Sequence, residues 1–471
     1  MTLDVDRNAI PGTFTLVDLE HTLATRHLNG GNSDIVLVPQ PSDDPDDPLN
    51  WSPRRKLLST ICVSSMGPTI LAAICIAVWQ ATDIPNVIDR NDRHADLGYF
   101  THERGTYMGL YAFFLAGSNY FAPVICGFIA EYQGWQWVFY YPAIFCAATA
   151  AFLFFCMEET NYMRESVERT TFINPVNSAT STSEKGEQEK SDPVDTPRHT
   201  DTEAGEVHNV YNKKTYIQKL SLLGPRQPKN HMLRRLWYAL YYLSWPVVFY
   251  AGFSYGSYLI FFNVLNATAS IILGSAPYNF RKSTAIVGLS YIACCLGVGL
   301  GAIFTGRFSD WLTIRLARRN NGTMEAEHRL WPFLICLIIL PGSLILWGVG
   351  AAHEVHWFGL LVAMCLLAMA NTCGVTLSVN YLVDSYRELS GDAMTSIILV
   401  RNTMSFAIGY GITPWINNMG YQNCFISAAF IGLACAAVFL VMVKYGKTLR
   451  IRSREKYWNL VVENWEKGMA H

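Results

Sequence analysis

"HERGTYMGLYAFFLAGSNYFAPVICGFIAEYQGWQW", residues 102–137, carries the strongest structural signal in this chain. It begins with charged residues, continues as a long apolar run and ends on two tryptophans. Glycines and a proline interrupt the run, at Gly109, Gly117, Pro123 and Gly127. In a water-soluble helix a glycine costs about 1 kcal/mol and a proline about 3 kcal/mol. A membrane helix tolerates both, because small residues allow close packing and neighbouring helices satisfy the backbone groups that proline frees.

The composition of the whole chain also indicates a lipid environment. Of the 471 residues, 51% are hydrophobic and only 15% are charged, whereas soluble proteins carry about 25% charged residues. The net charge of -1 gives no basic footprint, so we expect no nucleic-acid partner. All 12 cysteines fall inside apolar stretches without C-x-x-C spacing, which indicates packing residues and neither a metal site nor a disulfide framework.

Apolar segments long enough to cross a bilayer recur along the chain, since a spanning helix needs about 20 mostly apolar residues. We predict spans at residues 57–79, 107–130, 135–157, 237–262, 284–305, 331–350, 356–379, 395–416 and 422–444. The first residues lack the basic-then-apolar order of a signal peptide, so an internal apolar segment directs insertion. The sequence therefore predicts an all-α multi-pass membrane protein.

Polar stretches divide these spans into groups. We predict an N-terminal tail (1–55), an incomplete N-terminal helix bundle (56–157), a disordered loop (158–230), a six-helix C-terminal bundle (231–445) and a basic tail (446–471). The loop is rich in Ser, Thr, Glu and Pro and cannot bury a core. Lys and Arg gather before the first span, in the long loop and in the basic tail, which places the loop and both termini in the cytoplasm.

This topology has two consequences. Asn266, in an Asn-Ala-Thr sequon, falls in an external loop and becomes a predicted glycosylation site. Three spans before the loop cannot join a cytoplasmic N-terminus to a cytoplasmic loop, so either 57–79 does not cross or part of the first half is missing. A gap would lie at residues 80–101, which carry several charges and cannot span.

Several motifs resemble those of one transporter family. They are "DDPLNWSPRRK" (46–56), the stretch 102–137, "GRFSDWLTIRLARR" (306–319) and "NYLVDSYRELSGDAMTSIILVRNTMSF" (380–406). Together they resemble the major facilitator superfamily, and in particular the fungal branch of drug:proton antiporters and polyamine-type transporters. The resemblance covers roughly residues 43–160 and 210–455.

The resemblance implies two six-helix bundles that face each other across a central cavity. It also identifies the stretch 102–137 with the family's fifth span, although it contains only the second apolar segment of this chain. Counterparts of the second, third and most of the fourth span are absent. The implied architecture therefore has a first bundle that is incomplete, with about 9 apolar segments instead of 12.

The resemblance implies roles in conformational change for residues of two regions. In the antiporters the fifth span carries G-P and G-G pairs, which here read Ala122-Pro123 and Cys126-Gly127. The residues concerned are Arg104, Gly109, Gly117, Pro123, Gly127, Gly306 and Asp310. Asp310 would cap the next helix and pair with a basic residue to latch the bundles. The alternatives are ordinary close packing, an anchoring arginine and a solvated basic loop.

Polar groups within spans are costly and usually face a cavity. The predicted substrate path comprises Tyr255, Tyr258, Asn263, Asn371, Asn380, Arg401 and Asn402. For Arg401 the alternative is a side chain that snorkels to the membrane surface. The acids Glu103, Glu131, Glu158 and Glu159 flank spans, so no proton carrier stands out in mid-membrane.

These observations predict a secondary active transporter of the plasma membrane that works by alternating access. The expected substrates are small organic molecules, with efflux of a fungal metabolite or drug first and protons as a candidate coupling ion. The alternatives are uptake of polyamines or organic cations, and a truncated remnant that does not transport. No Walker motif, metal cluster or nucleophile motif is present, so we expect no ATP hydrolysis, cofactor or enzyme activity.

Overall fold

The computed structural model describes residues 9–16, 18, 36, 56, 101–156, 232–278, 280 and 283–466. The fold is helical, as the sequence predicts, apart from two strands of 3 residues each. The predicted span 57–79, the predicted loop 158–230 and most of the predicted N-terminal tail lie outside the described residues. The elements are β1 (Thr13–Thr15), α3 (Thr101–Tyr132), α4 (Trp137–Cys156), α7 (Met232–Tyr242), α8 (Pro246–Gly274), α9 (Thr284–Ser290), α10 (Ile292–Ile303), η3 (Phe304–Phe308), α11 (Ser309–Arg319), β2 (Thr323–Glu325), η4 (Ala326–Leu330), α12 (Phe333–Ala352), α13 (Trp357–Ser385), η5 (Arg387–Leu389) and α14 (Ser390–Glu466).

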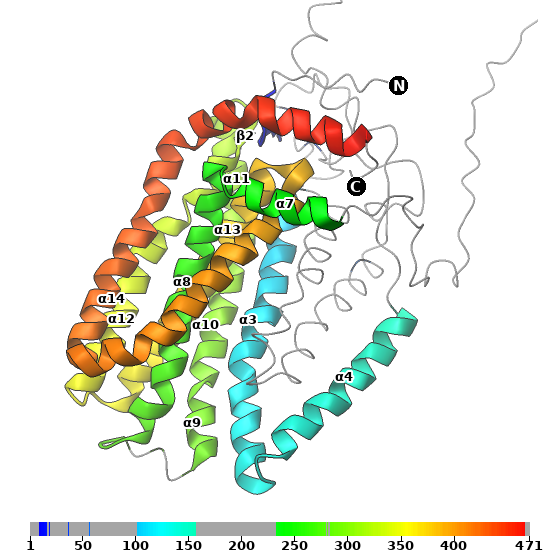
Figure 1. Ribbon diagram of the computed structural model, residues 1–471. Helices are drawn as coiled ribbons and strands as arrows, with labels where there is room; N and C mark the ends of the chain where they lie inside the picture. Colours follow the sequence, from blue (N-terminus) through cyan, green and yellow to red (C-terminus); the bar gives the residue numbers. More distant parts are fainter. Residues whose placement is uncertain are drawn as a thin grey trace, which may run out of the picture.

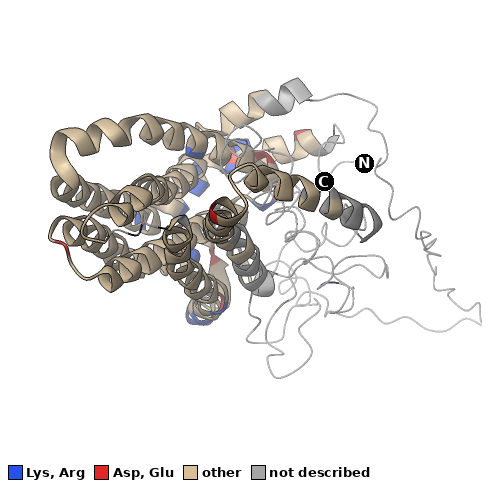
Figure 2. Ribbon diagram, turned by 90° about the horizontal axis from the view of Figure 1, so that it is seen from below, with Lys and Arg blue, Asp and Glu red and all other residues tan. Residues whose placement is uncertain are grey.

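The second half of the chain folds as a bundle of long helices, from α8 to α14 (Figure 1). Within the described residues, 5 helical stretches are long and apolar enough to cross a membrane. The last of them, which contains α14, holds two predicted spans, because Gly420 breaks the helix with φ 70° and ψ 168°. Figure 2 shows that the helices are drawn almost entirely in tan, so charged residues are rare along their length.

One predicted boundary is wrong. The sequence predicts a span at 237–262, whereas the structure has a short helix, α7, and then a separate long helix, α8, that starts at Pro246. Proline suits this first position, because its missing N–H has no partner there in any case. Because α8 continues to Gly274, Asn266 lies inside a helix and not in an external loop. Thr268 of the same sequon is buried and accepts a hydrogen bond from Trp347 Nε1 at 3.2 Å.

The motif at 306–319 is also placed differently from the prediction. The sequence predicts a loop after residue 305, but α10 continues through the π-helical turn η3 into α11. Asp310 is therefore the second residue of α11 within a continuing helix, and it does not stand in front of the helix as its N-cap. The basic residues that suggest a loop instead occupy an amphipathic extension of the helix.

Helix α3 packs against the second bundle along α9, α10, η3 and α11, whereas α4 leads away from it (Figure 1). The close approach depends on glycines of the second bundle. A Cβ atom on Gly288 of α9 would lie 2.6 Å from the Pro123 carbonyl oxygen. Gly117 of α3, by contrast, has no atom of the described residues within 4 Å of its Cβ position.

Candidate functional site

The candidate site begins with a buried charge in the middle of the second bundle. Arg401 lies in the first half of α14 and its residue is only 4% exposed. Two glycines of α8 allow α8 and α14 to approach closely here. A Cβ atom added to Gly252 would lie 3.1 Å from Val400 Cβ, and one added to Gly256 would lie 3.4 Å from Arg401 Cα. This close approach places the guanidinium directly beside α8.

The guanidinium of Arg401 binds two other residues of the predicted path. Its Nη1 donates a hydrogen bond to the Tyr255 hydroxyl at 2.9 Å, and Cζ lies 5.2 Å from the centre of the Tyr255 ring. Its Nε donates to Asn402 Oδ1 at 3.1 Å. The cation is therefore held over an aromatic face inside the protein, and it does not extend to the membrane surface. The structure brings together Tyr255, Arg401 and Asn402.

A second polar group lies where α3 meets α8 and α13. Tyr120 of α3 is 1% exposed, and its ring packs edge-on against Phe262 of α8 with centroids 4.9 Å apart. The Tyr120 hydroxyl lies near Asn371 of α13. Among the described residues, neither this hydroxyl nor Asn371 Oδ1 has a hydrogen-bond partner. Buried polar atoms normally have partners, so these atoms are available to water or to a ligand.

The remaining path residues are less closely grouped. Asn380 is 2% exposed, and within the described residues both its amide atoms lack a partner. Asn263 is half-buried on α8. Tyr258 fills the interior of the second bundle: its ring lies 5.9 Å from that of Phe333, and a Cβ on Gly374 would come within 2.1 Å of it. Tyr258 thus packs against α12 and α13, and the structure does not place it with Arg401.

A buried ion network closes one end of the second bundle, the end that carries β1 and β2, which we call the strand end. Arg329 of η4 is 1% exposed and lies between two carboxylates. Its Nη1 donates to Asp310 Oδ1 at 2.6 Å and its Nε to Asp384 Oδ2 at 2.8 Å. Asp310 therefore pairs with a basic residue, as the sequence predicts. The described partner belongs to the second bundle itself, so this contact joins α11, η4 and α13.

A different contact joins the two halves at the opposite end. Glu131, near the end of α3, accepts hydrogen bonds from the Ser283 hydroxyl and, at 2.8 Å, from the Ala285 amide. The carboxylate thus satisfies backbone and side-chain donors at the first turn of α9, where a negative charge is favourable. Arg104, Gly109 and Gly127 lie along the same helix α3, and Gly306 is buried in η3.

Sequence reasoning missed Tyr120, Glu131 and Arg329. Arg329 directly precedes a predicted span, where a basic residue is expected at the membrane surface. Nothing in the sequence therefore indicates that this arginine is buried. Glu131 flanks a span in the same way. Tyr120 stands among other aromatics of an apolar run, and only the packing of α3 on α8 distinguishes it.

The chain is similar in sequence to known membrane transporters. A family model described as Major Facilitator Superfamily matches residues 98–323. An uncharacterized MFS-type transporter of Schizosaccharomyces pombe is 26% identical over 96% of this chain and 94% of that protein. Protein HOL1 of Saccharomyces cerevisiae is 23% identical over 98% of each. The crystal structure of the human organic anion transporter MFSD10 (TETRAN) is 14% identical, with a TM-score of 0.40, over 82% of this chain and 81% of that one.

The chain is therefore similar to major facilitator transporters, and the family model covers a little under half of its residues. The alignments to the two yeast proteins extend over 553 and 585 positions, although this chain has only 471 residues. Each alignment therefore contains stretches of the relative that face gaps in this chain. The family model also begins to match only at residue 98, close to where the resemblance resumes after the predicted gap.

Proposed function

We propose that this protein is a secondary active transporter that exports a small organic metabolite or drug by alternating access. The observation that carries the proposal is the pair of polar groups between α3, α8, α13 and α14. One is buried Arg401 with buried Tyr255 and exposed Asn402, and the other is the buried Tyr120–Asn371 pair. Charged groups at this depth are costly and usually serve a substrate path. The relatives include a protein named Efflux pump FUBT of Fusarium oxysporum, 26% identical over 51% of this chain and 40% of that protein.

The proposal includes an orientation. Basic residues lie at the strand end, among them Arg318, Arg319, Lys447 and Arg450, which favours a cytoplasmic position for this end and for both termini. Protons are the proposed coupling ion and the plasma membrane the proposed location. Glycosylation of Asn266 stays a prediction. The glycan would have to be attached before α8 is inserted and packed, because Asn266 lies inside this helix.

The test is flux through the purified chain in liposomes with an imposed proton gradient. The panel contains an amphipathic neutral drug, an organic cation and spermidine, and a protonophore collapses the gradient. Gradient-dependent movement of the neutral drug supports efflux, whereas selective movement of spermidine or the cation favours the polyamine and organic-cation alternative. Flux that is the same with and without the proton gradient indicates a channel. Absence of flux from correctly inserted protein indicates a non-transporting remnant and contradicts the proposal.

A further inference from the structure

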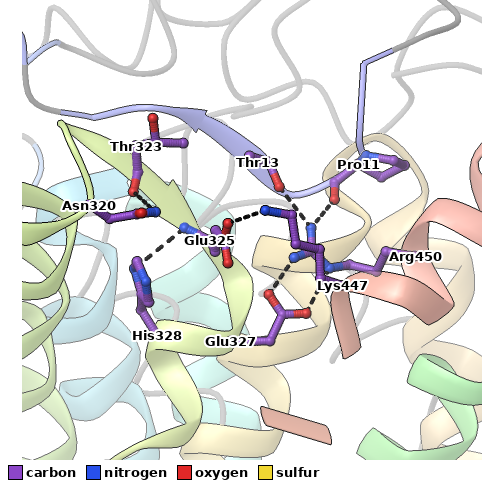
Figure 3. A network of polar contacts seen from close by, with 9 residues as sticks. All are labelled: Pro11, Thr13, Asn320, Thr323, Glu325, Glu327, His328, Lys447 and Arg450. Carbon is purple, nitrogen blue, oxygen red and sulfur yellow. Dashed lines mark hydrogen bonds and ion pairs between the residues drawn. The ribbon is translucent and has the colours of Figure 1, made fainter. Parts of the chain in front are cut away.

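Residues 9–16 form a short segment, the N-terminal strap, that docks on the strand end of the second bundle (Figure 3). Its strand β1 pairs antiparallel with β2, with Thr13 opposite Glu325 and Thr15 opposite Thr323. Two further backbone bonds extend the ladder, from Leu16 N to Gly322 O at 3.0 Å and from Ala326 N to Gly12 O at 3.2 Å. The strap precedes the first predicted span in sequence, yet its contacts are with the second bundle.

The strap completes the coordination of a buried cation. Arg450 of α14 is 0% exposed, and two of its nitrogens donate to the carboxylate of Glu327. Its Nη1 donates instead to strap oxygens, the Pro11 carbonyl and the Thr13 hydroxyl, the latter at 3.2 Å. Without the strap, part of a buried guanidinium would lose these acceptors, which is costly for a charge away from water.

Gly12 fits the strap tightly to the bundle. Its φ of +73° is one that residues with a side chain rarely adopt. A Cβ atom there would lie 2.6 Å from the Asp384 carbonyl oxygen and 2.8 Å from Ser385 Cα, both backbone atoms at the end of α13. Asp384 also binds Arg329 through its side chain, so the strap contacts a residue of the buried ion network.

The strap also supports α11 from one side. Leu16 is 1% exposed and packs with Ala317 of α11 and Met324 of β2, with Phe14 and Ile314 at the edge of the cluster. Helix α11 also lies against α3 of the first half of the chain. The strap therefore packs against the element through which the two halves of the chain meet at the strand end.

We propose that the strap is a built-in clamp: while it is docked, it holds α11 against α3 and disfavours separation of the two halves at the strand end. When it is released, α11 loses the apolar contact with Leu16 and β2 loses its hydrogen-bonded partner, and opening at this end becomes easier. The docking itself is independent of the proposed transport function. Only the interpretation of the opening as a step of alternating access rests on the proposed transport function.

The experiment is hydrogen–deuterium exchange on the full-length chain in nanodiscs, with Gly12→Ala as the variant. The matched control is Gly342→Ala, because Gly342 has open space at its Cβ position. In Gly12→Ala we expect amide exchange to rise at least about tenfold in β2 and α11, and in the first turns of α3. The Ala285 amide, held by Glu131 at the opposite end, should keep its protection. A peptide of residues 7–18 added to the variant should restore protection, and the same peptide with Gly12→Ala should not.

Two results would overturn the proposal. Unchanged exchange in α11 in Gly12→Ala, while β2 is deprotected, would show that α11 does not depend on the strap. A rise that includes the Ala285 amide to the same degree would show general destabilisation and no clamp at one end. Neither readout needs a transported substrate, so failure of the clamp and failure of the proposed transport function remain distinguishable.

Discussion

Arg401 shows what residue types within spans can predict. An arginine inside an apolar segment is rare enough to stand out, and so are nearby tyrosine and asparagine side chains. Their mutual contact is a different matter, because Tyr255 and Arg401 lie 146 positions apart and meet only when α8 packs on α14. The sequence could therefore predict the members of the cluster. It could not predict that Tyr258, one turn further along α8, packs against α12 and α13 instead.

Replacing Arg401 by lysine tests the geometry of this cluster. Lysine keeps the charge but loses the planar fork that binds Tyr255 and Asn402 together. We expect transport to fall by about 10- to 100-fold, the equivalent of a lost hydrogen bond to a charged group. Flux in liposomes measures the effect, at matched amounts of folded protein.

The matched control is Thr403→Ala, on the exposed side of the same helix, which should leave flux unchanged. Tyr255→Phe keeps the aromatic face and should lose less than Arg401→Lys. Normal flux in Arg401→Lys would mean that the cluster only packs the helices.

Replacing Arg329 by methionine tests the buried ion network. The change leaves the carboxylates of Asp310 and Asp384 without the guanidinium that lies between them. Breaking a buried pair in this way costs about 3–5 kcal/mol. Thermal unfolding followed by size-exclusion chromatography should therefore show a large loss of stability.

Two comparisons complete this measurement. Arg319→Ala, an exposed basic residue at the end of α11, should have little effect. Adding Asp310→Asn and Asp384→Asn to Arg329→Met should recover part of the loss, because the uncompensated charges are removed. If the triple variant is no more stable than the single variant, the unpaired carboxylate charges are not the cause of the lost stability.

At the scale of elements, apolar length predicts the spans well and boundaries poorly. The spans in the second bundle follow directly from runs of about 20 apolar residues. The continuation of α10 into α11 could not be predicted in the same way, because its basic residues are equally typical of a cytoplasmic loop. What holds this extension in helical form is tertiary: Asp310 binds Arg329, and Ala317 packs on Leu16.

Two glycines of α10 give opposite predictions although they are two residues apart. A Cβ on Gly297 would lie 2.0 Å from the Cys365 carbonyl oxygen of α13, a backbone atom that cannot move aside. The nearest atom to a Cβ on Gly299 is a Phe113 ring carbon at 3.7 Å, an ordinary contact. Gly297→Ala should therefore destabilise the protein by about 1–3 kcal/mol through overpacking, and Gly299→Ala should be neutral or stabilise it by up to about 1 kcal/mol.

Thermal unfolding of the two variants side by side checks this pair. Equal effects of the two substitutions would contradict the close crossing of α10 and α13.

At the scale of the whole molecule, the two halves meet through α3, and one polar contact described above lies at the end opposite the strap. Glu131→Ala removes the carboxylate that binds the first turn of α9. We expect the Ala285 amide and its neighbours to lose protection from exchange by about tenfold, with the strand end unchanged. Glu131→Gln keeps an acceptor and should lose less. A loss of protection that begins at β2 would contradict this assignment of ends.

The completeness of the first bundle is the remaining question at this scale. The parity of the spans predicts missing helices, and the alignments of 553 and 585 positions against 471 residues support the same interpretation. We expect a transcript sequenced across codons 78–100 to contain an additional coding stretch on the order of 60–80 codons, enough for three spans of about 20 residues each. An uninterrupted transcript would instead establish the short chain and favour the remnant.

The strap has a consequence for the order in which this protein is made. Two of its partners, Arg450 and Trp458, lie 439 positions after Pro11 and 449 positions after Ala9, so the strap is synthesised long before them. At about 5–20 residues per second, the ribosome needs on the order of 20 to 90 seconds between them. Throughout that interval the strap has no completed docking site. Pairing of β1 with β2 can therefore precede the hydrogen bonds to Arg450 and Trp458, which complete the docking only after α14 has been made.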